Sequence, residues 1–112
     1  MITTEAEIRP TIATQNDQFR RHPGRDWTIT SGVQAKGPLF VIVAIGAVRA
    51  FDAFAGDNDP HGEHEFGAFN LGPERLFWKI DYYDKDLAFG SPDPTDPSVT
   101  RRVLTVMLAS EY

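Results

Sequence analysis

The segment FGAFNLGPERLFWKIDYYD, residues 66–84, contains two aromatic-rich runs separated by the dipeptide Gly72-Pro73. A turn signal between two such runs is typical of a β-hairpin. Alternate side chains of a strand face opposite sides of a sheet. The apolar set of the second run, which we assign to the core, is Leu76, Trp78, Ile80 and Tyr82. The mixed aromatic and charged set on the other face is Phe77, Lys79, Asp81 and Tyr83.

Two further elements are predicted near the N-terminus. Residues 3–22, TTEAEIRPTIATQNDQFRRH, have the period of a helix. Its apolar stripe is Ile8, Ile12 and Phe19. Pro10 suits an early helical position, so we expect the regular part to begin near Arg9. The segment WTITSGV, residues 27–33, alternates and is rich in β-branched residues, which predicts a strand.

The segment GPLFVIVAIGAVRAFDAFAG, residues 37–56, is ambiguous. Its β-branched residues suit a buried strand, whereas its length and its alanine-rich second half favour a helix. Pro38 suits a first helical turn, and Gly56 could close the end. We therefore predict a buried amphipathic helix over residues 38–54. Its apolar stripe is Leu39, Ile42, Val43, Ala47, Ala50 and Phe54.

The C-terminal segment PSVTRRVLTVMLASEY, residues 97–112, follows a proline-punctuated loop. Asp96 and Pro97 have the order of an N-cap and a first-turn proline, so we predict a final helix. Its core-facing residues are Val99, Val103, Leu104, Val106, Met107 and Leu108. The chain would then form one α+β domain, residues 1–112, in the order α-β-α-β-β-α. A small antiparallel sheet, the hairpin plus one further strand, would pack against about three helices.

Charge and composition exclude several classes of protein. The 112 residues include 16 acidic and 11 basic side chains, a formal net charge of −5, whereas a general nucleic-acid-binding surface is normally basic. No cysteine is present, which excludes disulfides, thiolate nucleophiles and cysteine-ligated zinc. The N-terminus has acids where a signal peptide would have bases, and no apolar run is long enough to span a bilayer. We expect a cytoplasmic protein that binds neither nucleic acid nor membrane.

The acidic stretch GDNDPHGEHEFG, residues 56–67, contains the residue types of a metal site. Its start resembles a calcium-binding loop, but Ala68 stands at the twelfth position, where a bidentate carboxylate is required. Imidazole and carboxylate ligands suit a transition metal. The candidate ligands are Asp59, His61, His64 and Glu65. One hypothesis is therefore a metal-dependent hydrolase with Glu63 or Glu65 as the general base.

A structural interpretation of the same stretch is favoured. Asp and Asn before Pro and Gly form Asx turns, in which a side-chain oxygen accepts hydrogen bonds from the backbone. The histidines would pair with nearby carboxylates. The loop would hold an acidic surface in place, formed by Asp57, Asp59, Glu63 and Glu65. We predict that a partner protein binds this surface together with the mixed hairpin face, which consists of Phe77, Lys79, Asp81 and Tyr83.

The arginines have two alternative roles. The residues concerned are Arg20, Arg21, Arg25, Arg101 and Arg102. They could form a small basic patch. Alternatively, they could make salt bridges with the acidic loops or favour a helix C-terminus.

Three segments resemble a known family: FDAFAGDNDPHGEHEFGAF, FWKIDYYDKDL and GSPDPTDPSVTRRVLTVMLASEY. The family consists of small bacterial proteins of unknown function with D-N-D-P-x-G-E-H-D-F-G-like, F-W-K-I-D-Y-Y-D-like and T-R-R-V-L-T-I-M-L-A-like motifs. The resemblance covers roughly residues 48–112 and is weaker before them. Glu65 replaces the Asp usual before Phe-Gly. The resemblance implies no activity, but its similarity to proteins from plasmid- and phage-rich gene neighbourhoods implies a mobile-element accessory role.

The preferred hypothesis is a small acidic, non-enzymatic binding protein without cofactor or catalytic residues. A mobile-element role would make it an inhibitor of a bacterial defence system, of the anti-CRISPR or anti-restriction type. Its partner would be another protein, such as a component of a nucleic-acid-targeting defence complex. Two alternatives stay open, the metal-dependent hydrolase and a structural module that forms a homodimer through an apolar face.

Overall fold

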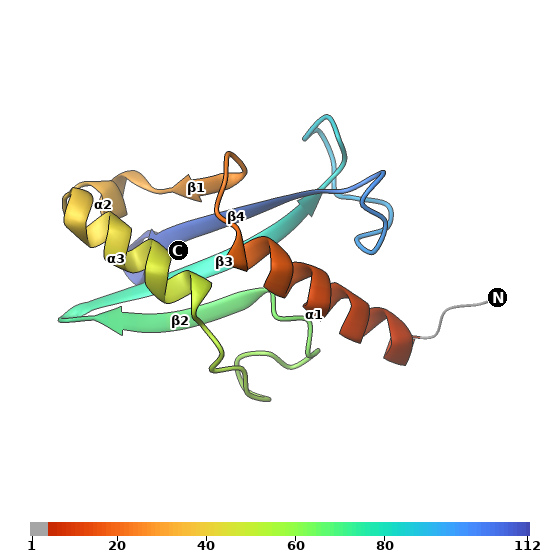
Figure 1. The fold of residues 1–112 in the computed structure, drawn as a ribbon, viewed down its shortest axis with the longest axis horizontal. Coiled ribbons are helices and arrows are strands. Elements are labelled where there is room, and N and C mark those ends of the chain that lie inside the picture. The colour runs from red at the N-terminus through yellow and green to blue at the C-terminus, as the bar shows by residue number, and fades with distance from the viewer. Residues whose placement is uncertain (1–4) are drawn as a thin grey trace.

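The strands of the chain form one mixed sheet, and helices pack on it (Figure 1). The computed structural model describes residues 5–112, with side chains from Thr11 onward. The helices are α1 (Glu5–Arg21), α2 (Ser31–Gln34), α3 (Pro38–Arg49) and the short 3₁₀ helix η1 (Ala109–Glu111). The strands are β1 (Trp27–Ile29), β2 (Phe66–Leu71), β3 (Glu74–Tyr83) and β4 (Arg101–Leu108). The predicted α+β class is confirmed.

The sheet has four strands in the order β1-β4-β3-β2. The β2/β3 and β3/β4 pairs are antiparallel, and the β1/β4 pair is parallel. The sheet is therefore mostly antiparallel, and the hairpin is joined by two further strands instead of the one predicted. The strand nearest the C-terminus lies inside the sheet, between the strand nearest the N-terminus and the hairpin.

The predicted hairpin is present with the predicted turn. Its register runs from Phe66 opposite Lys79 to Leu71 opposite Glu74, which leaves Gly72 and Pro73 as the two turn residues. Gly72 has a φ of +56°. A left-handed first residue followed by proline suits a type II′ turn, which matches the twist of the flanking strands.

The core lies between one face of the sheet and the helices α1 and α3, which cover the same face (Figure 1). The buried sheet residues are Leu76, Trp78, Ile80, Leu104 and Val106. Val33, Ala44 and Val48 pack on them from the helices. The opposite face, which we call the second face, carries Phe66, Ala68, Phe77, Lys79, Asp81, Tyr83, Val103, Thr105 and Met107. On this face the ring of Tyr112, which follows η1, packs near those of Phe66 and Phe77.

The predicted C-terminal helix is wrong, because residues 101–108 form β4. The expected cap chemistry is present but closes only a turn: Asp96 Oδ1 accepts a hydrogen bond from the Ser98 amide at 2.9 Å, and Val99 ends this turn. Both faces of β4 carry apolar residues, and such a strand also matches a helical period. The residues toward the helices are Leu104, Val106 and Leu108, and those toward the second face are Val103, Thr105 and Met107.

The helix predicted over residues 38–54 is α3, but it ends at Arg49. Of its predicted stripe, Phe54 packs on the core from the loop after the helix, whereas most of the residues within the helix do not face the core. Leu39, Ile42 and Val43 are exposed, and Ala44 and Val48 are buried instead. The error has a physical reason. The helix is apolar on every side, so its sequence does not distinguish a core-facing stripe from a solvent-facing one.

Two boundaries near the N-terminus also differ from prediction. The strand predicted over 27–33 ends at Ile29, because Thr30 caps the short α2, its hydroxyl accepting from the Val33 amide. The first helix begins at Glu5 instead of near Arg9, so Pro10 lies within it. The predicted position of the Ile8 side chain lies outside the described side chains.

Candidate functional site

The loop that follows α3 is held by its own Asn and Asp side chains. Asn58 Oδ1 accepts from the Ala55 amide at 2.9 Å. Asp59 Oδ1 accepts from the amides of Glu63 at 3.1 Å and His64 at 3.2 Å. These contacts confirm the prediction that side-chain oxygens of this stretch bind its backbone.

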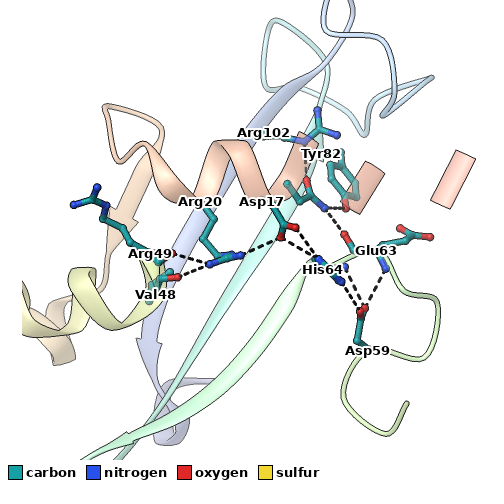
Figure 2. Close-up of polar contacts among 10 residues, drawn as sticks. Asp17, Arg20, Val48, Arg49, Asp59, Glu63, His64, Tyr82 and Arg102 are labelled. Atoms are coloured by element: carbon teal, nitrogen blue, oxygen red, sulfur yellow. Dashed lines mark hydrogen bonds and ion pairs between the residues drawn. The ribbon is translucent and has the colours of Figure 1, made fainter. Parts of the chain in front are cut away.

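His64 links the loop to α1 (Figure 2). Its Nδ1 lies 3.0 Å from both carboxylate oxygens of Asp17, and its Nε2 lies 3.6 Å from Oδ2 of Asp59. The ring stacks on Phe54 with centroids 3.9 Å apart. Both ring nitrogens face a carboxylate and one ring face is covered, so His64 is a structural bridge and is not arranged as a free base. The predicted pairing of histidine with carboxylates is confirmed for this residue.

Arg20 joins α1 to the C-terminal end of α3 (Figure 2). Its side chain is 1% exposed. The Nη1 atom donates to the carbonyls of Val48 at 2.9 Å and Arg49 at 3.0 Å, and Nη2 donates to Asp17 at 3.0 Å. The guanidinium carbon also lies over the rings of Phe54 and Trp78, 5.6 and 5.4 Å from their centroids. The predicted role of an arginine in supporting a helix C-terminus is confirmed here. Arg20 belongs to α1, and the helix that it supports is α3.

A second set of contacts centres on Asn16, which is fully buried. Its Nδ2 donates to the Glu63 carbonyl at 2.9 Å and to the Tyr82 hydroxyl at 2.8 Å. Its Oδ1 accepts from Arg102 Nε at 2.7 Å, and Tyr82 donates in turn to Glu65 at 3.2 Å. The loop is therefore fixed to α1, β3 and β4 by hydrogen bonds between residues far apart in the sequence.

Burial dominates the electrostatics of this set. It raises the pKa of the Tyr82 hydroxyl well above its ordinary value. It also raises the pKa of the Glu65 carboxyl, and the nearby charge of Glu63 adds to that rise. It lowers the pKa of Arg102. Each shift disfavours the charged form of its group, so a cation brought next to Glu65 would relieve part of the cost of burying that carboxylate.

A pocket of about 390 Å³ opens where the loop meets the second face. Its charged lining is Asp59, Glu65, Lys79 and Asp81, and the rings beside them are Phe66 and Tyr112. Lys79 Nζ donates to Asp81 Oδ2 at 2.7 Å. Phe66 lies 6.4 Å from Tyr112 and 5.2 Å from Phe77, centroid to centroid. The pocket thus combines carboxylates with an aromatic wall.

The structure brings together half of the predicted partner-binding residues. Four line this pocket, namely Asp59, Glu65, Lys79 and Asp81. Phe77 and Tyr83 lie on the same sheet face outside it. Asp57 is exposed in the loop, and Glu63 is half-buried. Asp59 differs from its expected role as an open contact, because its side chain is only 8% exposed and is occupied in holding the loop.

Of the residues proposed as metal ligands, Asp59 and His64 lie 3.6 Å apart, but the contacts of the others do not complete a site around them. His61 is exposed, His64 lies between two carboxylates, and Glu65 accepts from Tyr82. Across the part of the chain that the structure describes, no group of three or more His, Asp or Glu side chains is placed to hold a metal ion.

The sequence prediction missed the contribution of α1 to this region. Asn16 lies four residues after Ile12 and three before Phe19, on the stripe that faces the core. A polar side chain on an apolar stripe was the available signal, because a buried amide needs hydrogen-bond partners. Its partners were not predictable, since they come from the loop and the two central strands.

No helix within residues 5–112 is long and apolar enough to cross a membrane.

Comparison with known proteins places the chain in a family. No curated protein and no solved structure matches the chain. The model of the family described as "Protein of unknown function (DUF3768)" matches residues 29–111, from the end of β1 into η1, so α1 lies outside the match. The chain therefore belongs to this family of proteins of unknown function.

Proposed function

We propose that this protein is a non-enzymatic binding protein that docks on another protein through the second face and its pocket. One observation carries the proposal. The Lys79–Asp81 pair from β3 lies beside the rings of Phe66 and Tyr112 on the side of the sheet opposite α1 and α3, in a pocket that Asp59 and Glu65 of the loop border. Aromatic rings next to charged groups are the composition that protein interfaces favour.

The chemistry of the pocket fits a basic side chain of the partner. A lysine or arginine entering it would meet the carboxylate of Asp81 and the faces of nearby rings, which attract cations. Asp81 is already paired with Lys79, so the incoming cation would share this carboxylate with that lysine.

The overall charge supports a basic partner surface. The net charge is −5, and the exposed carboxylate of Asp57 adds to the negative surface beside the pocket. Opposite charges raise association rates, and salt screens them over about 10 Å at 0.1 M. The association rate with the partner is therefore expected to fall as ionic strength rises.

Affinity purification from the native host with tagged variants tests the proposal. Asp81→Lys reverses a charge in the pocket, and Asp86→Lys makes the same change in the exposed turn after β3. Wild type and Asp86→Lys should recover the same partner, and Asp81→Lys should recover about tenfold less. Thermal melting of each variant verifies folding. Recovery of no specific partner, or equal recovery by both variants, would refute the proposal.

We further propose that the partner is a component of a bacterial defence system. The resemblance to proteins from plasmid- and phage-rich gene neighbourhoods supports this assignment, and so do the small size and acidity of the chain. Expression in a strain with an active CRISPR or restriction system should restore plasmid transformation, and Asp81→Lys should not. If a partner is recovered but transformation stays restricted, the binding role holds and the defence role fails.

A further inference from the structure

The outer side of α3 is an apolar face that the described chain leaves uncovered. Leu39 is 74% exposed, Ile42 65% and Val43 49%. The inner side of the same helix packs in the core through Ala44 and Val48. A helix that is apolar on all sides is normally buried on all sides, so the outer side of α3 has the composition of an interface.

Gly46 lies on this outer side, toward the C-terminal end of α3, and is exposed. A Cβ built on it would meet no atom within 4 Å, so no contact in the described chain requires a glycine there. Glycine inside a helix is less stable than alanine. Close approach of a second backbone is the usual reason to keep a glycine on a helix face, and Ala50, one turn further, is also small and exposed.

We propose that α3 packs antiparallel against α3 of a second copy of this chain, about a two-fold axis near Val43. The large side chains, Leu39 and Ile42, lie toward the N-terminal end of the face. The small ones lie toward the other end, beside a hollow of about 290 Å³ lined by Arg21, Gly46, Arg49 and Ala50. Antiparallel packing places the large end of each copy over the hollow of the other, as a self-complementary two-fold contact requires.

Charge supports the same orientation. Glu74 lies at the N-terminal end of the face, in a hollow of about 620 Å³ that Leu39 and Val43 also line. It accepts from Lys36 through Oε1 at 2.6 Å, which leaves Oε2 for a further donor. Arg49 lies at the opposite end of α3. In the antiparallel pair, Arg49 of each copy comes to Glu74 of the other, and the helix dipoles oppose.

The surface around α3 supplies further apolar area. Stable interfaces bury about 800 Å² on each partner, more than one face of a short helix presents. Hollows flank α3 on both sides, one with Phe40, Leu71 and Pro73 and the other with Trp27 and Ile29. Because the second face lies across the sheet from α3, this contact does not rest on the proposed function and leaves that face open.

Sedimentation velocity over a dilution series tests the dimer. Wild type should dimerise at micromolar concentrations and above, and Gly46→Leu should weaken dimerisation about tenfold or more without lowering the melting temperature of the monomer. Phe89→Ser, which removes an exposed ring from the loop before β4, should dimerise as wild type does. A wild type that is monomeric throughout would overturn the proposal, and so would a dimer that Gly46→Leu does not weaken.

The lack of native cysteine allows a second, geometric test. A residue next to a two-fold axis faces its own copy, so Val43→Cys should form an intermolecular disulfide on mild oxidation, whereas Phe89→Cys should not. Arg49→Glu and Glu74→Arg should each weaken the dimer, and the double variant should regain affinity. Equal cross-linking at both cysteines, or no recovery in the double variant, would refute the antiparallel contact.

Discussion

Arg20 closes the C-terminal end of α3 from a neighbouring helix. The last carbonyls of a helix have no partners within it, and those of Val48 and Arg49 accept from Arg20 at 2.9 and 3.0 Å. Methionine would keep the apolar stem but remove the Arg20 hydrogen bonds to these carbonyls and to Asp17. Of these acceptors, Val48 would still accept from the Phe51 amide and Asp17 would still contact His64. We expect Arg20→Met to lower the free energy of unfolding by about 3–5 kcal/mol. Urea denaturation followed by the fluorescence of Trp27 and Trp78, the latter under Arg20, measures the loss.

The next residue supplies the control. Arg21 is exposed, so Arg21→Met removes the same charge without opening a buried contact. Its free energy of unfolding should stay within about 0.5 kcal/mol of wild type. Equal losses for the two variants would show that net charge, and not the contact with α3, accounts for the effect at position 20.

Glu65 is expected to lower the stability of the fold as pH rises. Its folded pKa is raised, mainly by burial, so between the unfolded and folded pKa values the folded chain holds a proton that the unfolded chain releases. Glu65→Gln removes this penalty, and its amide oxygen still accepts from Tyr82. The melting temperature of the variant should therefore exceed that of wild type at pH 7. The two should be equal below about pH 3.5, where Glu65 of wild type is protonated in both the folded and the unfolded chain.

Asp26 supplies a control, because its effect on stability changes with pH in the opposite direction. Hydrogen bonds from Arg101, the shortest 2.7 Å, lower its pKa. Its contribution is present above the unfolded pKa and is lost as pH falls through the folded value. Asp26→Asn should thus melt lower than wild type at pH 7 and converge with it in acid. Parallel pH profiles for the two variants would contradict the assigned causes.

Single residues were predictable where the partner is local. Asp59 binds amides four and five residues ahead, a pattern that the Asx signature contains. The partners of Asn16 and His64 come from elements far along the chain, and no local rule specifies them. The sequence therefore predicts the side chains that shape the loop, but it does not predict the helix and strands to which the loop is fixed.

At the scale of elements, β2 depends on its close approach to the core. A Cβ on Gly67 would collide with the indole of Trp78 and lie 2.8 Å from the Phe51 ring. Gly67→Val should therefore lower the free energy of unfolding by about 1–3 kcal/mol through overpacking. Ala68→Val, on the second face of the same strand, should change it by less than about 0.5 kcal/mol. Chemical denaturation compares them, and a harmless Gly67→Val would contradict the packing described.

The elements differ in how far their sequences specify them. The hairpin is unambiguous because polar and apolar residues alternate in β3 and Gly72 supplies the turn conformation. The strand β4 and the helix α3 are apolar on both sides, which removes the periodic signal. Residues 101–108 form a strand and not a helix because the edges of β1 and β3 would otherwise stay unpaired. That requirement belongs to the tertiary structure and was not available from residues 97–112 alone.

For the whole molecule, the order β1-β4-β3-β2 makes the sheet depend on its last strand. A chain that ends at residue 98 lacks β4, so β1 and β3 lose their shared neighbour. We expect this chain to show no cooperative thermal transition by circular dichroism. A peptide of residues 99–112 added to it should restore the transition. A cooperative transition in the shortened chain alone would show that the helices and hairpin form a stable core without β4.

The central position of β4 also constrains synthesis. A ribosome makes β1 and the hairpin first, and the edges of β1 and β3 stay unpaired until residue 108 has left the exit tunnel. Unpaired strand edges bind other extended chains, so the nascent protein is exposed to aggregation throughout that interval. A premature stop codon anywhere upstream of β4 should accordingly yield a substrate for proteases instead of a shorter working protein.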